Sequence, residues 1–278
     1  MKSFGREGWK GWLLTIVSML TGIMFIAPLY LVFINSVKSV QNIFLDPLGL
    51  PVKLQWENFV NVWNKIDYWK AFLNSAFFVI FGIVGLIAIC SMAAYRLSRN
   101  PTKRNRMIYL LLVSSILVPF QTVMIPLIKI LTWLHLYNTR GGVLLAYFGY
   151  GIPFATFLYF GFLKSIPKEV EESAQMDGCS HFGVYMKIVF PLLKPISVTV
   201  AVLDALWIYN DFLLPFVLIS GNRLRTLPLV MYTFFTAYDR PWDLAMASLA
   251  MVLLPAILTF IFLQKQVTGG IVAGAVKG

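Results

Sequence analysis

The chain is a series of long apolar stretches separated by short charged segments. Five runs carry no charged residue, and each can hold about 20 apolar residues, the length that crosses the hydrocarbon core of a bilayer as a helix. These runs lie between Lys10 and Lys38, Lys70 and Arg96, Arg106 and Lys129, Arg140 and Lys164, and Asp243 and Lys265. A sixth apolar segment contains Asp204 and Asp211. The pattern predicts an all-α membrane protein with six transmembrane helices, near residues 12–35, 71–94, 107–130, 142–164, 196–220 and 244–264.

The composition agrees with this pattern and excludes a soluble globular protein. Of the 278 residues, 59% are hydrophobic and 13% are charged, whereas soluble domains carry about 25% charged residues. The mean hydropathy is +0.76. The formal net charge of +11 indicates loops that face anionic lipid on the cytoplasmic side, and we expect no nucleic-acid partner.

The distribution of Lys and Arg predicts both termini in the cytoplasm. With the N-terminus inside, fourteen of the 23 basic residues lie on the cytoplasmic side and nine lie outside, as the positive-inside rule favours. The dense cluster RLSRNPTKRNR at 96–106 then falls inside. The first apolar run is longer than the core of a cleavable signal peptide, so we expect it to remain as an anchor. We predict one multi-pass transmembrane domain over residues 1–278, with a cytoplasmic tail at 265–278.

A polar segment, residues 166–195, lies between the fourth and fifth predicted helices on the cytoplasmic side. Its sequence predicts a short helix over 168–176, with three glutamates near the positive N-terminal end. A sharp turn at Gly178 follows, and then a second short helix over 182–189 that ends at Pro191. Two short helices at an angle form a knob that fits a groove in a soluble partner. An ordinary cytoplasmic hairpin is the alternative.

Four residues of this segment have the spacing of a known motif. Glu172, Gly178, Ile188 and Pro191 stand at offsets of 0, 6, 16 and 19, as in the EAA loop of permeases from ATP-binding-cassette (ABC) importers. The chain resembles the carbohydrate family of these permeases over nearly its whole length. The similar stretches include AAYRLSR at 93–99, VPFQTVMIPL at 118–127, YNDFLLP at 209–215 and GGIVAGAVKG at 269–278. The last of these looks like the tail of the six-helix, G-type subunit of the maltose-type permease pair.

The resemblance implies an ABC type I importer permease fold in the bacterial cytoplasmic (inner) membrane. In that family two permeases form a heterodimeric pore, and an extracytoplasmic solute-binding protein delivers a sugar or oligosaccharide. Two ATPase subunits, which bind ATP and magnesium, dock on the cytoplasmic side against the EAA loop and the C-terminal tail. The chain itself is then expected to bind no cofactor.

The resemblance also implies roles for individual residues of the segment. Glu172 would pair with a basic residue of an ATPase, Gly178 would make the turn, and four apolar side chains would pack. The residues implied to form the coupling site are Glu172, Ala174, Met176, Asp177, Gly178, Phe182, Ile188 and Pro191.

Five residues in the apolar segments are candidates to line the pore: Gln121, Asp204, Trp207, Asn210 and Asp211. A carboxylate that faces lipid at the bilayer centre costs about 2.5–3.5 kcal/mol, so the aspartates should face a pore, a partner helix or another polar group. Asp204 and Asp211 are seven residues apart and would share a helical face, near Trp207. Carboxylates and an aromatic ring suit a hydroxyl-rich sugar. Hydrogen bonds to a partner helix are the alternative.

Prolines interrupt the third predicted helix. Pro119 and Pro126 flank Gln121 and leave backbone carbonyls that neighbouring groups must satisfy. A bend at the pore and ordinary packing both agree with this pattern.

Other classes of function lack their motifs in this sequence. There is no G-x-x-x-x-G-K-[ST] loop, so the chain does not bind ATP by that route, and no catalytic cluster indicates an enzyme. The two cysteines and two histidines indicate neither a disulfide nor a metal site. The alternative functions are an ABC permease for another solute, such as a glycerol phosphodiester or an amino acid, and an ion-coupled secondary transporter that uses the intramembrane aspartates.

Overall fold

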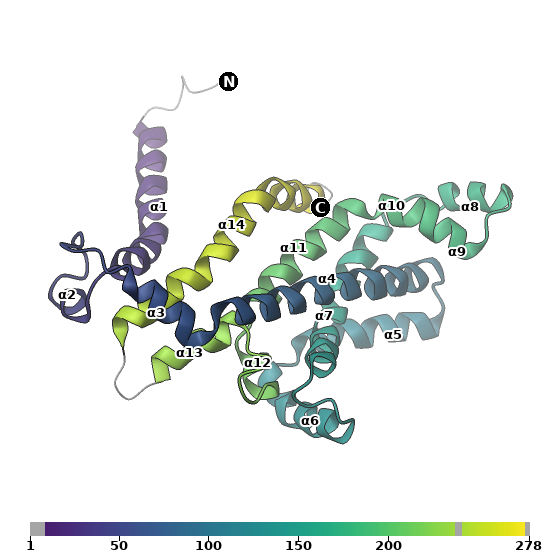
Figure 1. Ribbon diagram of the computed structural model, residues 1–278. Helices are drawn as coiled ribbons and strands as arrows, with labels where there is room; N and C mark the ends of the chain where they lie inside the picture. The colour runs from purple at the N-terminus through teal and green to yellow at the C-terminus, as the bar shows by residue number, and fades with distance from the viewer. Residues whose placement is uncertain (1–8, 237–240, 276–278) are drawn as a thin grey trace. The chain divides into compact units, whose positions relative to one another are not determined.

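The computed structural model describes residues 9–236 and 241–275, with side chains described at residue 9 and from residue 11 through residue 261. Every regular element in this part of the chain is a helix (Figure 1). The elements are α1 (Trp9–Asn35), α2 (Val40–Leu45), α3 (Glu57–Ile66), α4 (Tyr68–Arg99), α5 (Lys103–Ser114), the 3₁₀ turn η1 (Ser115–Leu117), α6 (Phe120–Trp133), α7 (Arg140–Leu163), α8 (Glu169–Met176), α9 (His181–Val184), the π-helical turn η2 (Tyr185–Val189), α10 (Phe190–Leu192), α11 (Lys194–Asn210), α12 (Leu213–Leu218), α13 (Leu227–Thr236) and α14 (Trp242–Ala275).

The chain forms two compact units, residues 1–68 with 231–254 and residues 69–230 with 255–278. In the first unit, the apolar face of α3 packs on α13 and α14, where Val62 is fully buried in a cluster with Phe234. The Tyr68 hydroxyl donates a hydrogen bond to the Met251 carbonyl oxygen at 3.0 Å. In α1 no residue of the apolar window that could span a membrane is buried, as expected of a helix that contacts lipid.

Two apolar cores hold the second unit together. One joins α4 and α7 to the segment from α8 to α11, and the other joins α4, α6, α7, α11 and α12 around Tyr147. The helices α4 and α7 approach closely because Gly151 has no side chain. A Cβ added at Gly151 would lie only 2.6 Å from Leu86 Cδ1, so a larger residue would push the two helices apart.

Within the described residues, four helices are long and apolar enough to cross a membrane: Gly11–Asn35, Tyr68–Arg99, Arg140–Leu163 and Trp242–Ile261. Two bent pairs pass the same test only when each pair is taken as one span, namely Lys103–Leu117 with Phe120–Trp133 and His181–Leu192 with Lys194–Asn210. The all-α class is therefore confirmed. The count of six spans and the single domain stay predictions.

The third predicted helix, 107–130, is not continuous. Its two parts meet at an angle of 110°, and Val118 between them is extended, with φ −82° and ψ 115°. Pro119 explains the break, because proline disfavours the helical conformation of the residue before it. Pro126 lies inside α6. Of the two interpretations of these prolines, a bend is therefore correct, and it occurs at Pro119.

The fifth predicted helix, 196–220, is also divided. α11 ends before Asp211, which is extended with ψ 123°. The Asp211 Oδ1 atom accepts hydrogen bonds from the backbone N–H groups of Leu213 at 3.0 Å and Leu214 at 3.4 Å, at the start of α12. Aspartate favours such contacts over the helix interior. The expectation that Asp211 shares a helical face with Asp204 is therefore wrong.

Candidate functional site

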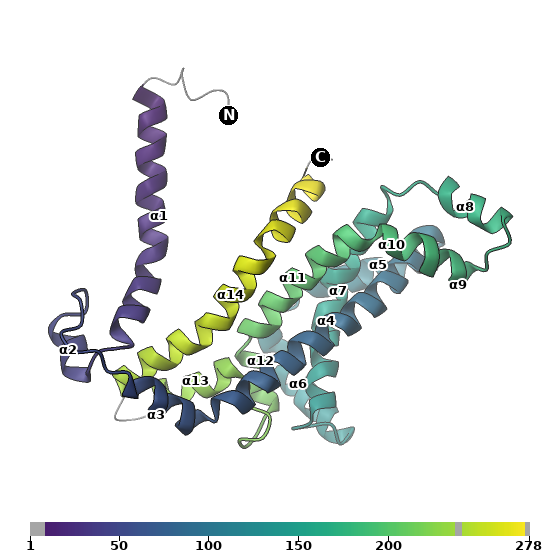
Figure 2. The ribbon, with the colours of Figure 1, turned by 45° about the horizontal axis from the view of Figure 1, so that its top comes forward.

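The coupling segment, residues 166–195, begins much as the sequence predicts, and Figures 1 and 2 show its helices α8 and α9 at one end of the second unit. α8 starts one residue later than expected and carries three glutamates in its first turn. Gly178 follows with φ +84°, a left-handed conformation that glycine adopts without strain. A Cβ added there would meet no heavy atom within 4 Å. Backbone conformation, and not crowding, therefore explains this glycine.

The second half of the coupling segment is more divided than expected. α9 is a single turn capped by Ser180, whose Oγ accepts a hydrogen bond from the Gly183 N–H at 3.1 Å. The turn η2 and the short α10 follow, so the expected helix 182–189 consists of two elements. It also does not end at Pro191, which lies in the first turn of α10, where the missing N–H needs no partner. The chain changes direction by 70° only between α10 and α11.

The predicted coupling residues fall into two groups by exposure. Ala174 is buried and Ile188 is half-buried, and both belong to the core that includes α4 and α7. Met176 and Phe182, in contrast, are 83% and 63% exposed. The Phe182 ring lies 6.5 Å from that of Tyr185, between centroids, but most of both side chains remains open to another molecule, and their packing against an ATPase stays a prediction.

The outer face of α8 also carries free charge. Glu172 is exposed, as is Asp177 at the end of the helix. In the described part of the chain, the Glu172 carboxylate has no hydrogen bond or ion pair. It borders an open cleft between α8, η2 and the end of α4, which Phe182 and His181 also line. The carboxylate is thus free to meet a cation of another molecule.

The neighbouring Glu171 has the opposite environment, which the sequence analysis missed. It is 5% exposed. Its Oε1 atom lies 2.7 Å from Arg99 Nη2 and accepts a hydrogen bond from Arg99 Nε, also at 2.7 Å. Its Oε2 atom accepts one from the Tyr95 hydroxyl at 2.9 Å. Arg99 also donates to the Ile166 carbonyl oxygen at 2.9 Å, so α8 is anchored to the end of α4.

A second polar contact joins the coupling segment to α4. The hydroxyl groups of Tyr185 in η2 and Ser91 in α4 are 2.7 Å apart and share a hydrogen bond. The ring of Tyr185 also lies 5.4 Å from that of Tyr95, between centroids. Together with the ion pair of Glu171, these contacts attach the coupling segment to two positions on α4, Arg99 and Ser91. One signal could have indicated the anchor: Glu171 is three residues before the apolar Ala174, a spacing that places both on one helix face.

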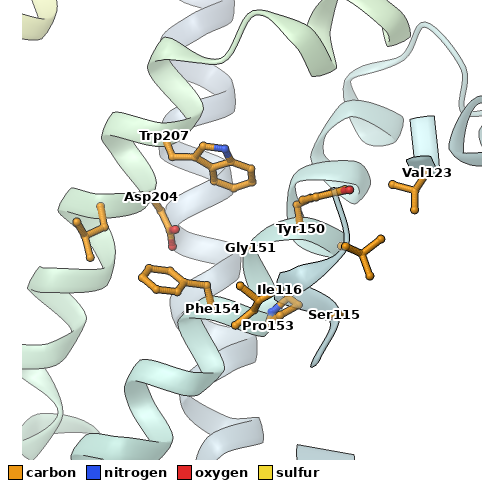
Figure 3. Close-up of a pocket in the computed structure, with 12 residues that line it drawn as sticks. Ser115, Ile116, Val123, Tyr150, Gly151, Pro153, Phe154, Asp204 and Trp207 are labelled. Carbon is orange, nitrogen blue, oxygen red and sulfur yellow. The ribbon is translucent and has the colours of Figure 1, made fainter. Parts of the chain in front are cut away.

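A second candidate site is a cavity of about 570 Å³ between η1, α6, α7 and α11 (Figure 3). Two of the predicted pore-lining residues, Asp204 and Trp207, line it from α11. Tyr150 and Phe154 line it from α7 and were not predicted. Aromatic residues make up 15% of the chain, so nothing in the sequence distinguishes these two from lipid-facing rings.

The other three predicted pore-lining residues lie outside this cavity. Gln121 is exposed on α6. The Asn210 side chain donates a hydrogen bond to the Leu206 carbonyl oxygen of its own helix at 2.8 Å, and Asp211 holds the start of α12. Their roles in a pore stay predictions. Among the residues described, no group of three or more His, Cys, Asp or Glu could hold a metal ion.

Comparison with known proteins links this arrangement to membrane transport. Residues 85–271 match the family described as binding-protein-dependent transport system inner membrane component. The chain is 38% identical over 266 residues to the probable starch degradation products transport system permease protein AmyC of Thermoanaerobacterium thermosulfurigenes. This alignment covers 96% of this chain and 97% of the relative. It is 30% identical over 267 residues to the melibiose/raffinose/stachyose import permease protein MelC of Bacillus subtilis (strain 168), with 96% of each chain covered.

The fold has a counterpart among solved structures. A chain in the crystal structure of a bacterial ABC transporter involved in the import of the acidic polysaccharide alginate superposes with a TM-score of 0.83 and 20% identity, covering 95% of this chain and 99% of the other. The family match covers well over half of the chain, and its members are integral inner membrane transport components, not enzymes. The chain therefore belongs to the family of inner membrane components of binding-protein-dependent transport systems.

Proposed function

We propose that this chain is a permease subunit of a sugar-importing ABC transporter. It forms half of a heterodimeric pore and moves a sugar or oligosaccharide across the cytoplasmic membrane by alternating access. The observation that carries this proposal is the nearly end-to-end likeness to relatives named for starch degradation products and for melibiose, raffinose and stachyose. A solute-binding protein delivers the sugar from outside, and both termini lie in the cytoplasm.

In this proposal separate ATPase subunits supply the energy through the coupling segment. Glu172 offers an unpaired carboxylate, and Met176 lies one helical turn further along the same face of α8. Phe182 adds a second exposed apolar side chain. A charge flanked by large apolar side chains suits a groove that contains a basic residue. ATP and magnesium bind to those subunits and not to this chain, and the tail at 265–278, whose side chains lie outside the described residues, is expected to contact them too.

The anchor on α4 supports a mechanical role for the segment. When ATP closes the ATPase dimer, the two coupling segments of the pore move toward each other, and the permease helices change from inward-facing to outward-facing. A segment that swung freely on its loops would absorb this displacement. Because Arg99 and Ser91 hold α8 and η2, the displacement passes to α4.

The test is reconstitution of the assembled transporter. The chain is purified with its partner permease, ATPase and solute-binding protein, and placed in proteoliposomes. We expect at least one of maltotriose, raffinose and melibiose to stimulate ATP hydrolysis in the presence of the binding protein and to be taken up only with ATP. Uptake by this chain alone under a proton or sodium gradient would contradict the proposal. So would stimulation by amino acids or glycerol phosphodiesters and by no sugar.

A further inference from the structure

We propose that the loop after α2 lies in the interface of the lipid bilayer, where it contacts acyl chains of the leaflet at the C-terminal end of α1. Three exposed leucines form the contact surface, which we call the leucine patch: Leu45, Leu48 and Leu50, which are 83%, 65% and 77% exposed. In the predicted orientation this leaflet is the outer one. The proposal does not depend on which solute the protein transports.

The loop is attached to the end of α1 by hydrogen bonds to its backbone. The Tyr30 hydroxyl donates to the Leu48 carbonyl oxygen at 2.7 Å, and Asn35 Nδ2 donates to the Pro47 carbonyl oxygen at 3.0 Å. Figures 1 and 2 both show the loop beside this end of the helix. The leucine patch therefore has a fixed height along α1.

The position of Tyr30 gives the depth of the leucine patch in the bilayer. The span Gly11–Asn35 has 25 residues and is therefore about 37 Å long, whereas the hydrocarbon core is about 30 Å thick. With the span centred in the bilayer, about 4 Å at each end lies among the headgroups. Tyr30 lies about 7.5 Å before the end of the helix. The Leu48 carbonyl group is thus held at the edge of the hydrocarbon, where tyrosine side chains are enriched.

Contacts within the loop make the leucine patch rigid. Lys38 is 1% exposed, and its Nζ atom donates a hydrogen bond to the Asp46 carbonyl oxygen at 2.7 Å. The Asp46 Oδ1 atom accepts one from the Gly49 N–H at 2.8 Å, and a Cβ added at Gly49 would clash with this carboxylate. Asp46 is the one charged residue between Leu45 and Leu50, and its carboxylate is held by the loop itself. A rigid surface loses little conformational entropy on binding.

The leucine patch continues the apolar surface of α1. No residue of the α1 window that could span a membrane is buried, and Tyr30 and Phe33 near its end are 42% and 37% exposed. Segments that lie in the interface bury their apolar side chains about 5–10 Å into the boundary between headgroups and acyl chains. The leucines stand at this depth beside a helix that contacts lipid, so acyl chains are the apolar material within their reach.

A solute-binding protein is a less suitable occupant of the leucine patch. It approaches from the water, beyond the end of α1, whereas the Leu48 carbonyl group is held before that end. Interfaces that form and dissociate are about as polar as the rest of a protein surface. The leucine patch is formed by aliphatic side chains, which suit acyl chains better.

Quenching of a fluorescent label tests the contact with lipid. Leu48→Cys is made in a transporter that is otherwise free of cysteine, with Cys90→Ala and Cys179→Ser in this chain. The thiol is labelled with nitrobenzoxadiazole, and the assembled complex is placed in proteoliposomes. We expect a phospholipid with a nitroxide near the head of its acyl chain to quench most of the emission, and iodide in the water to quench little.

The matched control is the same label at Glu57→Cys. Glu57 is exposed at the start of α3. The next residue, Asn58, donates hydrogen bonds to the carbonyl oxygens of Ser36 and Lys38, which follow the end of α1. Glu57 therefore lies on the water side of the leucine patch. We expect strong quenching by iodide and weak quenching by the nitroxide lipid at this position.

The hydrogen bond of Tyr30 is tested with the same label at residue 48. Tyr30→Phe keeps the ring but removes the donor, so the Leu48 carbonyl group loses its partner at the edge of the hydrocarbon and moves toward water. We expect weaker quenching by the nitroxide lipid and stronger quenching by iodide at residue 48, with residue 57 unchanged. Unchanged quenching at residue 48 would overturn the role of Tyr30 in setting the depth of the loop.

The other outcomes at Leu48→Cys overturn the proposal and show what covers the leucine patch instead. Iodide quenching that the solute-binding protein prevents would assign the patch to that protein. Iodide quenching that it does not prevent would place the patch in water. Quenching by neither reagent would bury the patch against the partner permease. These measurements require no transport, so failure of the sugar-import function would leave their result unchanged.

Discussion

At the scale of single residues, two adjacent glutamates of α8 divide the work of the coupling segment. Glu171 is buried with both carboxylate oxygens engaged by Arg99 and Tyr95, and Glu172 is exposed. Successive side chains of a helix point about 100° apart. One face of α8, with Glu171, therefore attaches to α4, and another face, with Glu172, is exposed to solvent. The spacing match identified Glu172 from sequence. Glu171 could not be identified in that way, because its partner Arg99 lies 72 positions earlier.

Reversal of the charge at Glu172 is expected to uncouple the transporter. Glu172→Lys should abolish sugar uptake and separate ATP hydrolysis from transport, because its ammonium group would repel a basic residue in the ATPase groove. The protein should still insert, since the Glu172 carboxylate has no hydrogen bond or ion pair within the described chain. Uptake and ATP hydrolysis are measured in proteoliposomes, and insertion is measured by immunoblot of membranes. Glu169→Lys, also exposed in the first turn of α8, is the control, and normal uptake by Glu172→Lys would refute the assignment.

Removal of one member of the Arg99–Glu171 pair is expected to destabilise the protein. The side chains are 14% and 7% exposed, and a buried ion pair that loses one partner typically costs about 3–5 kcal/mol. Glu171→Ala should therefore lower the melting temperature of the purified complex. The double variant Arg99→Leu/Glu171→Leu should recover most of the loss, because no charge is left buried. Glu172→Ala is the matched control on the adjacent residue. Equal melting temperatures for the two alanine variants would show that the Arg99–Glu171 pair does not stabilise the attachment of α8 to α4.

At the scale of elements, the sequence predicted where helices occur better than where they break. Uncharged runs predicted the main helices, because apolar length is a local property. A bend at the prolines was one of two possibilities, the other being ordinary packing; the chain breaks at Pro119, whereas Pro126 lies in the same run and leaves α6 intact. Packing between helices decides such cases, and one sequence does not show it. The sequence also did not predict the π-helical turn at Tyr185, or the contact of its hydroxyl group with Ser91 on another helix.

The turn between α8 and α9 is expected to require a residue that tolerates positive φ. A left-handed conformation costs most residues roughly 1–2 kcal/mol, and Gly178 has φ +84°. Gly178→Val should therefore misplace α9 and lower the amount of ATPase that co-purifies with the permease. Gly178→Asn should retain more, because asparagine visits this conformation more readily. Equal recovery of ATPase with valine and asparagine would show that the turn conformation is unimportant.

At the scale of the whole molecule, orientation in the membrane rests on charge. The all-helical fold and the family are established, whereas the direction of the chain across the bilayer follows from the excess of Lys and Arg on one side. Helix packing within the protein carries no information about which side faces the cytoplasm. If the predicted orientation is right, the coupling segment lies in the cytoplasm and the loop near Val52 lies outside.

A membrane-impermeant maleimide tests this orientation. Cys179 in the coupling segment is partly exposed, whereas Cys90 is buried, so labelling reports mainly on Cys179. We expect no reaction in intact cells that produce the permease without its ATPase, and reaction after permeabilisation. Val52→Cys in a Cys179→Ser background is the positive control for the outer side, because Val52 is 96% exposed. Labelling of Cys179 in intact cells would reverse the topology.

The two-faced character of α8 has a consequence for how such transporters diversify. Among the described residues, the ion pair that fixes the helix to its own chain lies on the side of Glu171, so substitutions at Glu172 and Met176 are expected to leave that attachment intact. The exposed residues of α8 can therefore change in evolution together with the ATPase surface that they contact. One permease scaffold could be adapted to a different ATPase, or several permeases could converge on a shared one, by exchanging a few exposed side chains.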